Sequence, residues 1–296
     1  ACMFHMMNEA RIGIGMAATM LGLAGYYASL DYAKNRPQGR PVGQGGKDAA
    51  QPQVRIIEHA DVKRMLLAQK SYGEGALALN LFCARLVDEQ HTGAPEAADE
   101  ARLLLEVLTP IAKSWPSEFC LEANSLAIQI HGGYGYTRDF PVEQYWRDNR
   151  LNMIHEGTHG IQAMDLLGRK VLMEGGKGLA LLAGRINGTV QRALQVPRLA
   201  AHANALAGAL QQVGAATKAA WATGEPGDLH AGIRPHGAGM GVAGFGPGDV
   251  GQRRCRGTTG QRGPHGCHAV FLPLRAAQDW CLAAGGQYPR RHLRTD

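Results

Sequence analysis

The sequence lacks the features that mark several protein classes. Its 296 residues contain no uninterrupted apolar run of about 20 residues, the length that a membrane-spanning helix needs. No segment alternates apolar and polar residues as a half-buried strand does. The N-terminus shows no basic stretch followed by a small-residue cleavage site, the pattern of a secretory signal. We therefore expect neither a membrane span nor a β-rich fold.

Cysteine pairing and metal-ligand spacing are also missing. The six cysteines show no close pairing pattern, and three of them fall in helical patterns, where a thiol acts as a small apolar side chain. The histidines lack the spacing of metal ligands, so no metal site is expected. Unpaired thiols are typical of a reducing compartment, which favours a cytoplasmic protein.

Charge and glycine are unevenly distributed. The formal net charge is +6, yet residues 224–296 hold nine arginines, no lysine and only five acidic residues. Residues 224–268 also hold 14 of the 40 glycines. A basic chain can indicate an acidic partner such as nucleic acid, but the first 223 residues are nearly balanced. Composition therefore marks a boundary near Gly224, and nucleic acid is not an expected partner.

The Gly/Arg-rich tail, residues 224–296, has the composition that GC-rich coding DNA yields in a shifted reading frame. It is rich in Gly, Arg, Pro, Ala and His and lacks Lys, whose codons are A-rich. Cys255 and Cys267 with their neighbouring histidines fit no compact zinc pattern. We expect this tail to be disordered or poorly packed. An uninterrupted frame through Glu225 in the resequenced locus, with the tail confirmed by mass spectrometry, would contradict the frameshift hypothesis.

The first 223 residues have helical patterns throughout. Residues 3–35 are dense in apolar residues without proline, and from 58 to 90 the apolar residues recur at helical spacing. Pro110 and Pro116 are expected to interrupt the next stretch. The helices predicted after residue 90 cover 97–108, 118–131, 141–150, 158–173 and 199–221.

Helices without strands favour an all-α fold, an antiparallel four-helix-type bundle. We expect three regions: the bundle over 1–175, an Ala-rich helical extension over 176–223, and the tail over 224–296.

One stretch of about 35 residues carries the chemical signal. It contains Gln129-Ile130-His131-Gly132-Gly133-Tyr134-Gly135-Tyr136, then Pro141-Val142-Glu143, Arg147-Asp148, Glu156-Gly157-Thr158 and Ile161-Gln162. These segments, in this order, resemble the C-terminal signature of the acyl-CoA dehydrogenases, flavoproteins that desaturate acyl-CoA thioesters.

Two upstream segments extend the resemblance. Asn8-Glu9-Ala10-Arg11 is similar to the family's N-E-x-R helix opening, and Arg36-Pro37-Gln38-Gly39 to its R-x-x-G turn. The amino-acid sequence around both segments is most similar to that of the long subgroup that includes 3-methylmercaptopropionyl-CoA dehydrogenases. The resemblance covers roughly residues 2–220.

The resemblance implies a mechanism with FAD as cofactor. Glu156 would take the α-proton of the thioester while flavin N5 accepts the β-hydride. A carboxylate suits this task if burial raises its pKa. Read without the motif, Glu156 is an ordinary acid at a helix N-terminus, and Gly132-Gly133 is a helix C-cap.

The resemblance also implies the residues that bind cofactor and substrate. Gln129 and Gly133 would contact FAD across a dimer interface, and Arg36 would meet the FAD pyrophosphate of the partner subunit. The residues expected at FAD are Arg36, Gln129, Gly132, Gly133, Thr158, His159 and Gly160. Those expected at the acyl-CoA are Asn8, Arg11 and Gly157.

The family pattern includes an N-terminal helical domain and a middle β-domain that this sequence does not match. We therefore expect the C-terminal part of a larger enzyme, inactive alone, that forms a homo-oligomer (dimer or tetramer) and passes electrons to an electron-transfer protein.

Two alternative functions remain. One is an acyl-CoA oxidase, in which oxygen reoxidises the flavin. The other is a catalytically silent homologous module that binds nucleic acid through the basic tail.

Overall fold

The computed structural model describes residues 2–40 and 50–222, so the predicted tail lies outside the described residues. Seven α-helices make up most of the described chain, which contains no β-strand. They are α1 (Cys2–Asn35), α2 (Ala60–Thr92), α3 (Pro95–His131), α4 (Val142–Leu151), α5 (His159–Gly168), α6 (Lys177–Leu194) and α7 (Ala200–Trp221). The expectation of an all-α fold is confirmed.

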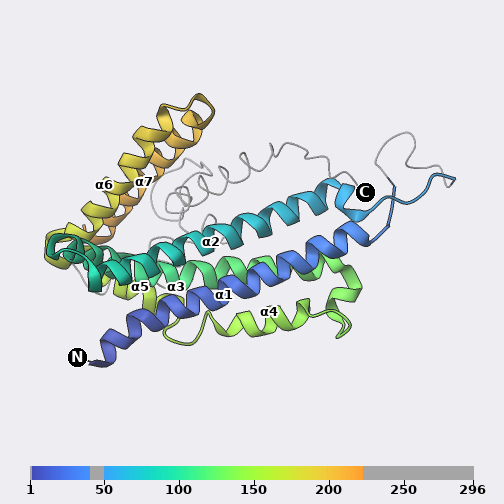
Figure 1. Cartoon of the computed structure of the whole chain (residues 1–296), viewed down its shortest axis with the longest axis horizontal. Helices are drawn as coiled ribbons and strands as arrows, with labels where there is room; N and C mark the ends of the chain where they lie inside the picture. The colour runs from blue at the N-terminus through green and yellow to red at the C-terminus, as the bar shows by residue number, and fades with distance from the viewer. Residues whose placement is uncertain (1, 41–49, 223–296) are drawn as a thin grey trace, which may run out of the picture.

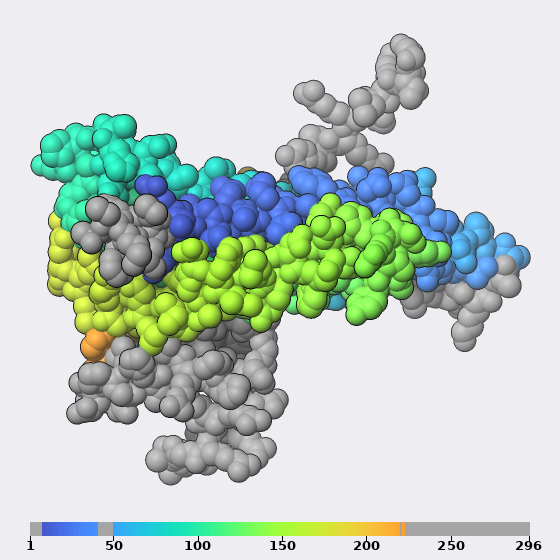
Figure 2. All heavy atoms as spheres, turned by 90° about the horizontal axis from the view of Figure 1, so that it is seen from below, coloured from blue at the N-terminus to red at the C-terminus, as the bar shows by residue number. Residues whose placement is uncertain are grey.

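Helices α1 to α4 form an antiparallel bundle (Figure 1). The three long helices α1, α2 and α3 lie side by side, and the chain reverses direction between consecutive helices. The short α4 runs back along α1 and α3, and Figure 2 shows it beside α1 on one face of the molecule. Helices α6 and α7 pair as a hairpin at the end of the bundle where α2 meets α3.

The predicted interruption at Pro110 and Pro116 is wrong, because α3 runs through both prolines. An internal proline costs a helix about 3 kcal/mol, but α3 is buried against α1, α2 and α4 over most of its length. Trp115, between the prolines, is fully buried and stacks on Phe119. Tertiary packing therefore outweighs local propensity here.

Two differences concern the region after residue 158. The helix expected over 158–173 ends at Gly168 and is followed by a 3₁₀ segment, η4 (Lys170–Gly176), in which Glu174 and Gly175 have positive φ. Helix α6 was not predicted as a separate helix. Its glycines at 178, 184 and 188 lower its helix propensity, and packing against α3 and α7 supports it instead.

Glycines on α1 allow α1 and α3 to approach closely. A Cβ at Gly15 would lie 2.0 Å from the Ala112 carbonyl oxygen, and one at Gly22 would lie 2.7 Å from the Cβ of Cys120. A Cβ at Gly25 would lie 2.5 Å from Asn124 Nδ2. At Gly15 and Gly22, therefore, only a residue without a side chain fits.

Helix α1 over Asn8–Asn35 is the one helix of the described residues that is long and apolar enough to cross a membrane. Length and composition alone do not distinguish a membrane span from a core helix. Here α1 packs against α2, α3 and α4, and it buries Arg11, Thr19 and Ser29. These contacts are those of a core helix in a bundle.

We predict that Gly15→Ala lowers the free energy of unfolding by about 1–3 kcal/mol or more, because the new methyl group collides with the backbone of α3. Gly13→Ala is the matched control, since a Cβ at Gly13 meets nothing within 4 Å. It should raise the free energy of unfolding by about 0.5–1 kcal/mol through helix propensity. Urea unfolding of the two variants measures both effects, and equal shifts would contradict the close approach.

Candidate functional site

The residues singled out from the sequence form two groups, one at each end of α1. Arg11 lies on α1 and belongs to the first group, and Arg36, which directly follows α1, belongs to the second. The helix between them spans roughly 37 Å. The first group is Asn8, Arg11, Glu156, Gly157, Thr158, His159 and Gly160, and the second is Arg36, Gln129, Gly132 and Gly133.

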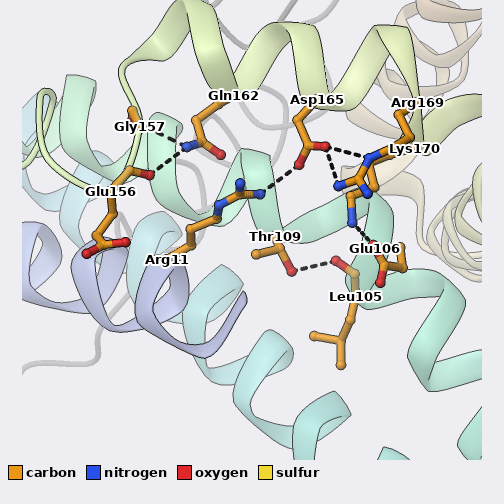
Figure 3. A network of polar contacts seen from close by, with 10 residues as sticks. All are labelled: Arg11, Leu105, Glu106, Thr109, Glu156, Gly157, Gln162, Asp165, Arg169 and Lys170. Atoms are coloured by element: carbon orange, nitrogen blue, oxygen red, sulfur yellow. Dashed lines mark hydrogen bonds and ion pairs between the residues drawn. The ribbon is translucent and has the colours of Figure 1, made fainter. Parts of the chain in front are cut away.

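Glu156 and Gly157 form a left-handed turn between α4 and α5. Glu156 has φ +54°, which is uncommon for a non-glycine residue, and Gly157 has φ +93°. A Cβ at Gly157 would lie 2.6 Å from Gln162 Nε2, so this position needs glycine. The Glu156 side chain is exposed and extends away from Gln162 (Figure 3). The burial expected for this carboxylate is therefore not provided by the described residues.

Two buried side chains bind the carbonyl oxygens of this turn. Gln162 Nε2, from α5, donates to the oxygens of Glu156 at 2.9 Å and Gly157 at 3.3 Å (Figure 3). Lys113 Nζ, from α3, donates to the Gly157 oxygen at 2.6 Å. Both side chains are fully buried, so the core of the bundle fixes the backbone beneath the exposed carboxylate.

A chain of amide side chains anchors the other side of the turn. Asn149 Nδ2, on α4, donates to Asn124 Oδ1 at 2.7 Å and to the Ala18 oxygen at 3.2 Å. Asn152 Nδ2 donates to Asn149 Oδ1 at 3.0 Å, and His155 Nε2 lies 3.0 Å from Asn152 Oδ1. This chain links α1 and α3 to the residue just before Glu156.

Arg11 is an ion-paired core residue. It is only 5% exposed, and its Nη1 lies 2.7 Å from Asp165 Oδ2, while Arg169 binds the other oxygen of Asp165 at 2.7 Å. Nearby, buried Lys170 pairs with Glu106 (Figure 3). Arg11 is therefore not a solvated surface residue. Its contact with acyl-CoA stays a prediction, as does that of half-buried Asn8.

Burial lowers the pKa of Lys113 from its ordinary 10.5 to about 8. The cation of Arg11 lowers this pKa further, and the carboxylate of Glu156 raises it. The charges of both Arg11 and Glu156 therefore influence the protonation of Lys113.

The first turn of α5 suits a cofactor with anionic and polar atoms. Thr158 is the N-cap residue, exposed, and its hydroxyl makes no capping hydrogen bond. The first N–H groups of a helix have no partner within the helix and carry its positive dipole end. A Cβ at Gly160 would meet nothing within 4 Å, which leaves open space there. His159 Nε2 lies 2.9 Å from Glu118 Oε2.

The second group also suits a phosphate-bearing ligand. The Nε atom of Arg36 is buried without a hydrogen-bond partner, and its guanidinium lies 5.6 Å from the centre of the Tyr134 ring. Gly132, at φ +63°, and Gly133 both face open space where a Cβ would stand, and Gln129 is exposed. A guanidinium with an unsatisfied donor beside open backbone fits a pyrophosphate.

Sequence reasoning missed several residues that shape the site, among them Lys113, Glu118, Asn149 and Asp165. Lys113 did carry a signal, because it is a single charge inside an apolar stretch of a core helix. Charges at such positions are rarely fully buried without a partner. Gln162 lies in the recognised motif, but its contact with the turn follows only from the fold.

Neither thiol chemistry nor a metal centre emerges from the described parts of the chain. Cys83 and Cys120 are buried free thiols, and burial raises the pKa of each to about 12. Such thiols are unreactive near neutral pH. No cluster of three or more potential metal ligands occurs within residues 2–40 and 50–222.

Comparison with known proteins gives a consistent result. A family model described as acyl-CoA dehydrogenase, C-terminal domain, matches residues 2–172. The 3-methylmercaptopropionyl-CoA dehydrogenase of Ruegeria pomeroyi is 41% identical over 187 residues, 63% of this chain and 31% of that protein. The chain spans about a third of the length of the curated relatives it matches.

Two solved structures share the fold. Caenorhabditis elegans ACDH-11 in complex with C11-CoA has a TM-score of 0.65 at 18% identity, covering 98% of this chain and 44% of that one. An acyl-CoA dehydrogenase complexed with FAD from Bacillus anthracis has a TM-score of 0.60 at 20% identity, covering 82% and 40%.

The lowered pKa of Lys113 predicts a pH-dependent stability. Between about pH 8 and 10.5 the unfolded chain retains this lysine proton and the folded chain has lost it, so the free energy of unfolding rises with pH. Lys113→Met lacks this contribution. The stability of wild type relative to Lys113→Met should therefore increase from pH 7.5 to pH 10, measured by urea unfolding. A difference that stays constant would contradict the shifted pKa.

Proposed function

Since the chain belongs to the acyl-CoA dehydrogenase family through its C-terminal domain, we propose that it is the C-terminal helical part of an FAD-dependent acyl-CoA dehydrogenase. The reaction is α,β-desaturation of an acyl-CoA thioester. The observation that carries this proposal is the left-handed turn at Glu156 and Gly157, which holds an exposed carboxylate on a backbone fixed by the core.

Glu156 is the base in this proposal. A thioester Cα–H is acidic enough for a carboxylate to remove its proton if the two are held at hydrogen-bond distance. The fixed turn supplies that placement, and Gly157 leaves the backbone beside the carboxylate free of side-chain atoms, so that the thioester approaches closely. Domains beyond this chain would cover Glu156 and exclude water from it.

FAD is the proposed cofactor, and when bound it accepts the hydride that leaves Cβ. Thr158, His159 and Gly160 would hold it at the first turn of α5, where Thr158 is exposed, its hydroxyl makes no capping hydrogen bond, and the first N–H groups have no partner within the helix. The relative from Bacillus anthracis that shares this fold was solved with FAD, which supports the assignment.

The second group serves a second copy of the chain in this proposal. Arg36, Gln129 and Gly133 lie roughly 37 Å along α1 from the Glu156 group, so we assign them to the FAD of a partner subunit. The unsatisfied Nε of Arg36 would bind its pyrophosphate. The working enzyme is thus a homo-oligomer, cytoplasmic, with acyl-CoA as substrate and an electron-transfer protein as acceptor.

A chimera tests the proposed function. This chain replaces the matching C-terminal third of the Ruegeria pomeroyi relative, and flavin absorbance establishes that FAD is bound. We expect turnover of an acyl-CoA thioester with an artificial electron acceptor. Glu156→Gln should reduce kcat by about 10²–10⁴-fold, because an amide cannot act as a general base.

Glu96→Gln is the matched control, since it removes an exposed carboxylate from the first turn of α3 and should leave turnover unchanged. Full activity of Glu156→Gln would refute the assignment of the base. Peroxide formation with oxygen at a rate matching the artificial acceptor would favour the oxidase instead.

A further inference from the structure

We propose that Lys113 and Gln162 form a clamp on the catalytic turn, and that Lys113 is a positioning residue for the reaction. The clamp holds the backbone of Glu156 and Gly157 so that the carboxylate points out of the bundle toward the thioester. This inference rests on the proposed function, in which Glu156 is the base.

The clamp reaches the turn from two different helices. Lys113 comes from α3 and Gln162 from α5, and their donors converge on the Gly157 oxygen at 2.6 Å and 3.3 Å. Gln162 also binds the Glu156 oxygen at 2.9 Å. Both carbonyl groups of the turn are therefore tied to the core, one of them twice.

The turn needs such support because its conformation is unfavourable. Two consecutive residues have positive φ, and the left-handed region is unfavourable for a non-glycine residue such as Glu156. Strain of this kind persists only where the surroundings over-determine it. Without the clamp, the turn would relax toward ordinary backbone geometry, and the direction of the Glu156 side chain would change with it.

Lys113 differs from the other buried lysine of the described chain. Lys170 pairs directly with the carboxylate of Glu106, whereas the hydrogen bond of Lys113 goes to a backbone carbonyl. Burying an ammonium without a contacting carboxylate is costly. Burial lowers the pKa of both lysines to about 8, and only that of Lys113 is raised in turn by the charge of Glu156. The ammonium therefore binds the turn and also attracts the carboxylate that the turn carries.

Hydrogen exchange on the full chain tests the clamp without any catalysis. The amides of Ile154, His155 and Gln162 form hydrogen bonds that flank the turn. In Lys113→Met they should exchange about 10- to 100-fold faster, the effect of losing one charged hydrogen bond. Helices α1 and α2 should keep their protection, because Met fills the same space without a buried charge.

Lys170→Met is the matched control, since it removes a second buried ammonium that does not contact the turn. It should leave exchange around the turn unchanged. Gln162→Met is the second clamp variant and should accelerate the same amides as Lys113→Met. Unchanged exchange around the turn in both clamp variants would overturn the inference.

The chimera separates positioning from simple stability. Lys113→Met should lower kcat by about 10- to 100-fold, as expected for a displaced base, with KM within about threefold of wild type. Equal loss in Lys113→Met and Lys170→Met would overturn the inference, because both would then act only on folding. If the unmodified chimera binds FAD but shows no turnover, the proposed function fails, while the exchange experiment still decides whether Lys113 holds the turn.

Discussion

The close approach of α1 to α3 is the constraint on which the rest of the structure depends. Gly15, Gly22 and Gly25 bring the two backbones so near that no Cβ fits between them. This contact places Arg11 within reach of Asp165 on α5, and it places the Ala18 oxygen within reach of Asn149 on α4. Both connections therefore rely on residues of α1 that have no side chain.

Buried polar side chains connect the candidate site to the core of the bundle. Lys113, Gln162 and Asn149 are buried, and the first two hold the carbonyl groups of the turn. Buried polar networks cost stability unless every member is satisfied, but they specify a unique geometry. Here the buried donors fix the backbone that carries the exposed carboxylate.

Much of the fold followed from the sequence, and the failures have physical causes. Apolar spacing located α1, α2 and α7, but it could not show that burial carries α3 through Pro110 and Pro116. Glu156, Gly157 and Thr158 could be recognised as site residues because they are adjacent in the sequence and form one segment of the motif. Lys113 was missed because it reaches the turn from α3, which is distant in the sequence, and Asn149 because its partners Ala18 and Asn124 come from α1 and α3.

The continuous helix between Arg11 and Arg36 fixes both the distance and the rotation that relate the two groups of candidate residues. One inserted residue would move the far end of the helix by about 1.5 Å and rotate it by about 100°. The guanidinium of Arg36 would then no longer lie over the ring of Tyr134. Insertions and deletions inside α1 are therefore incompatible with both groups at once.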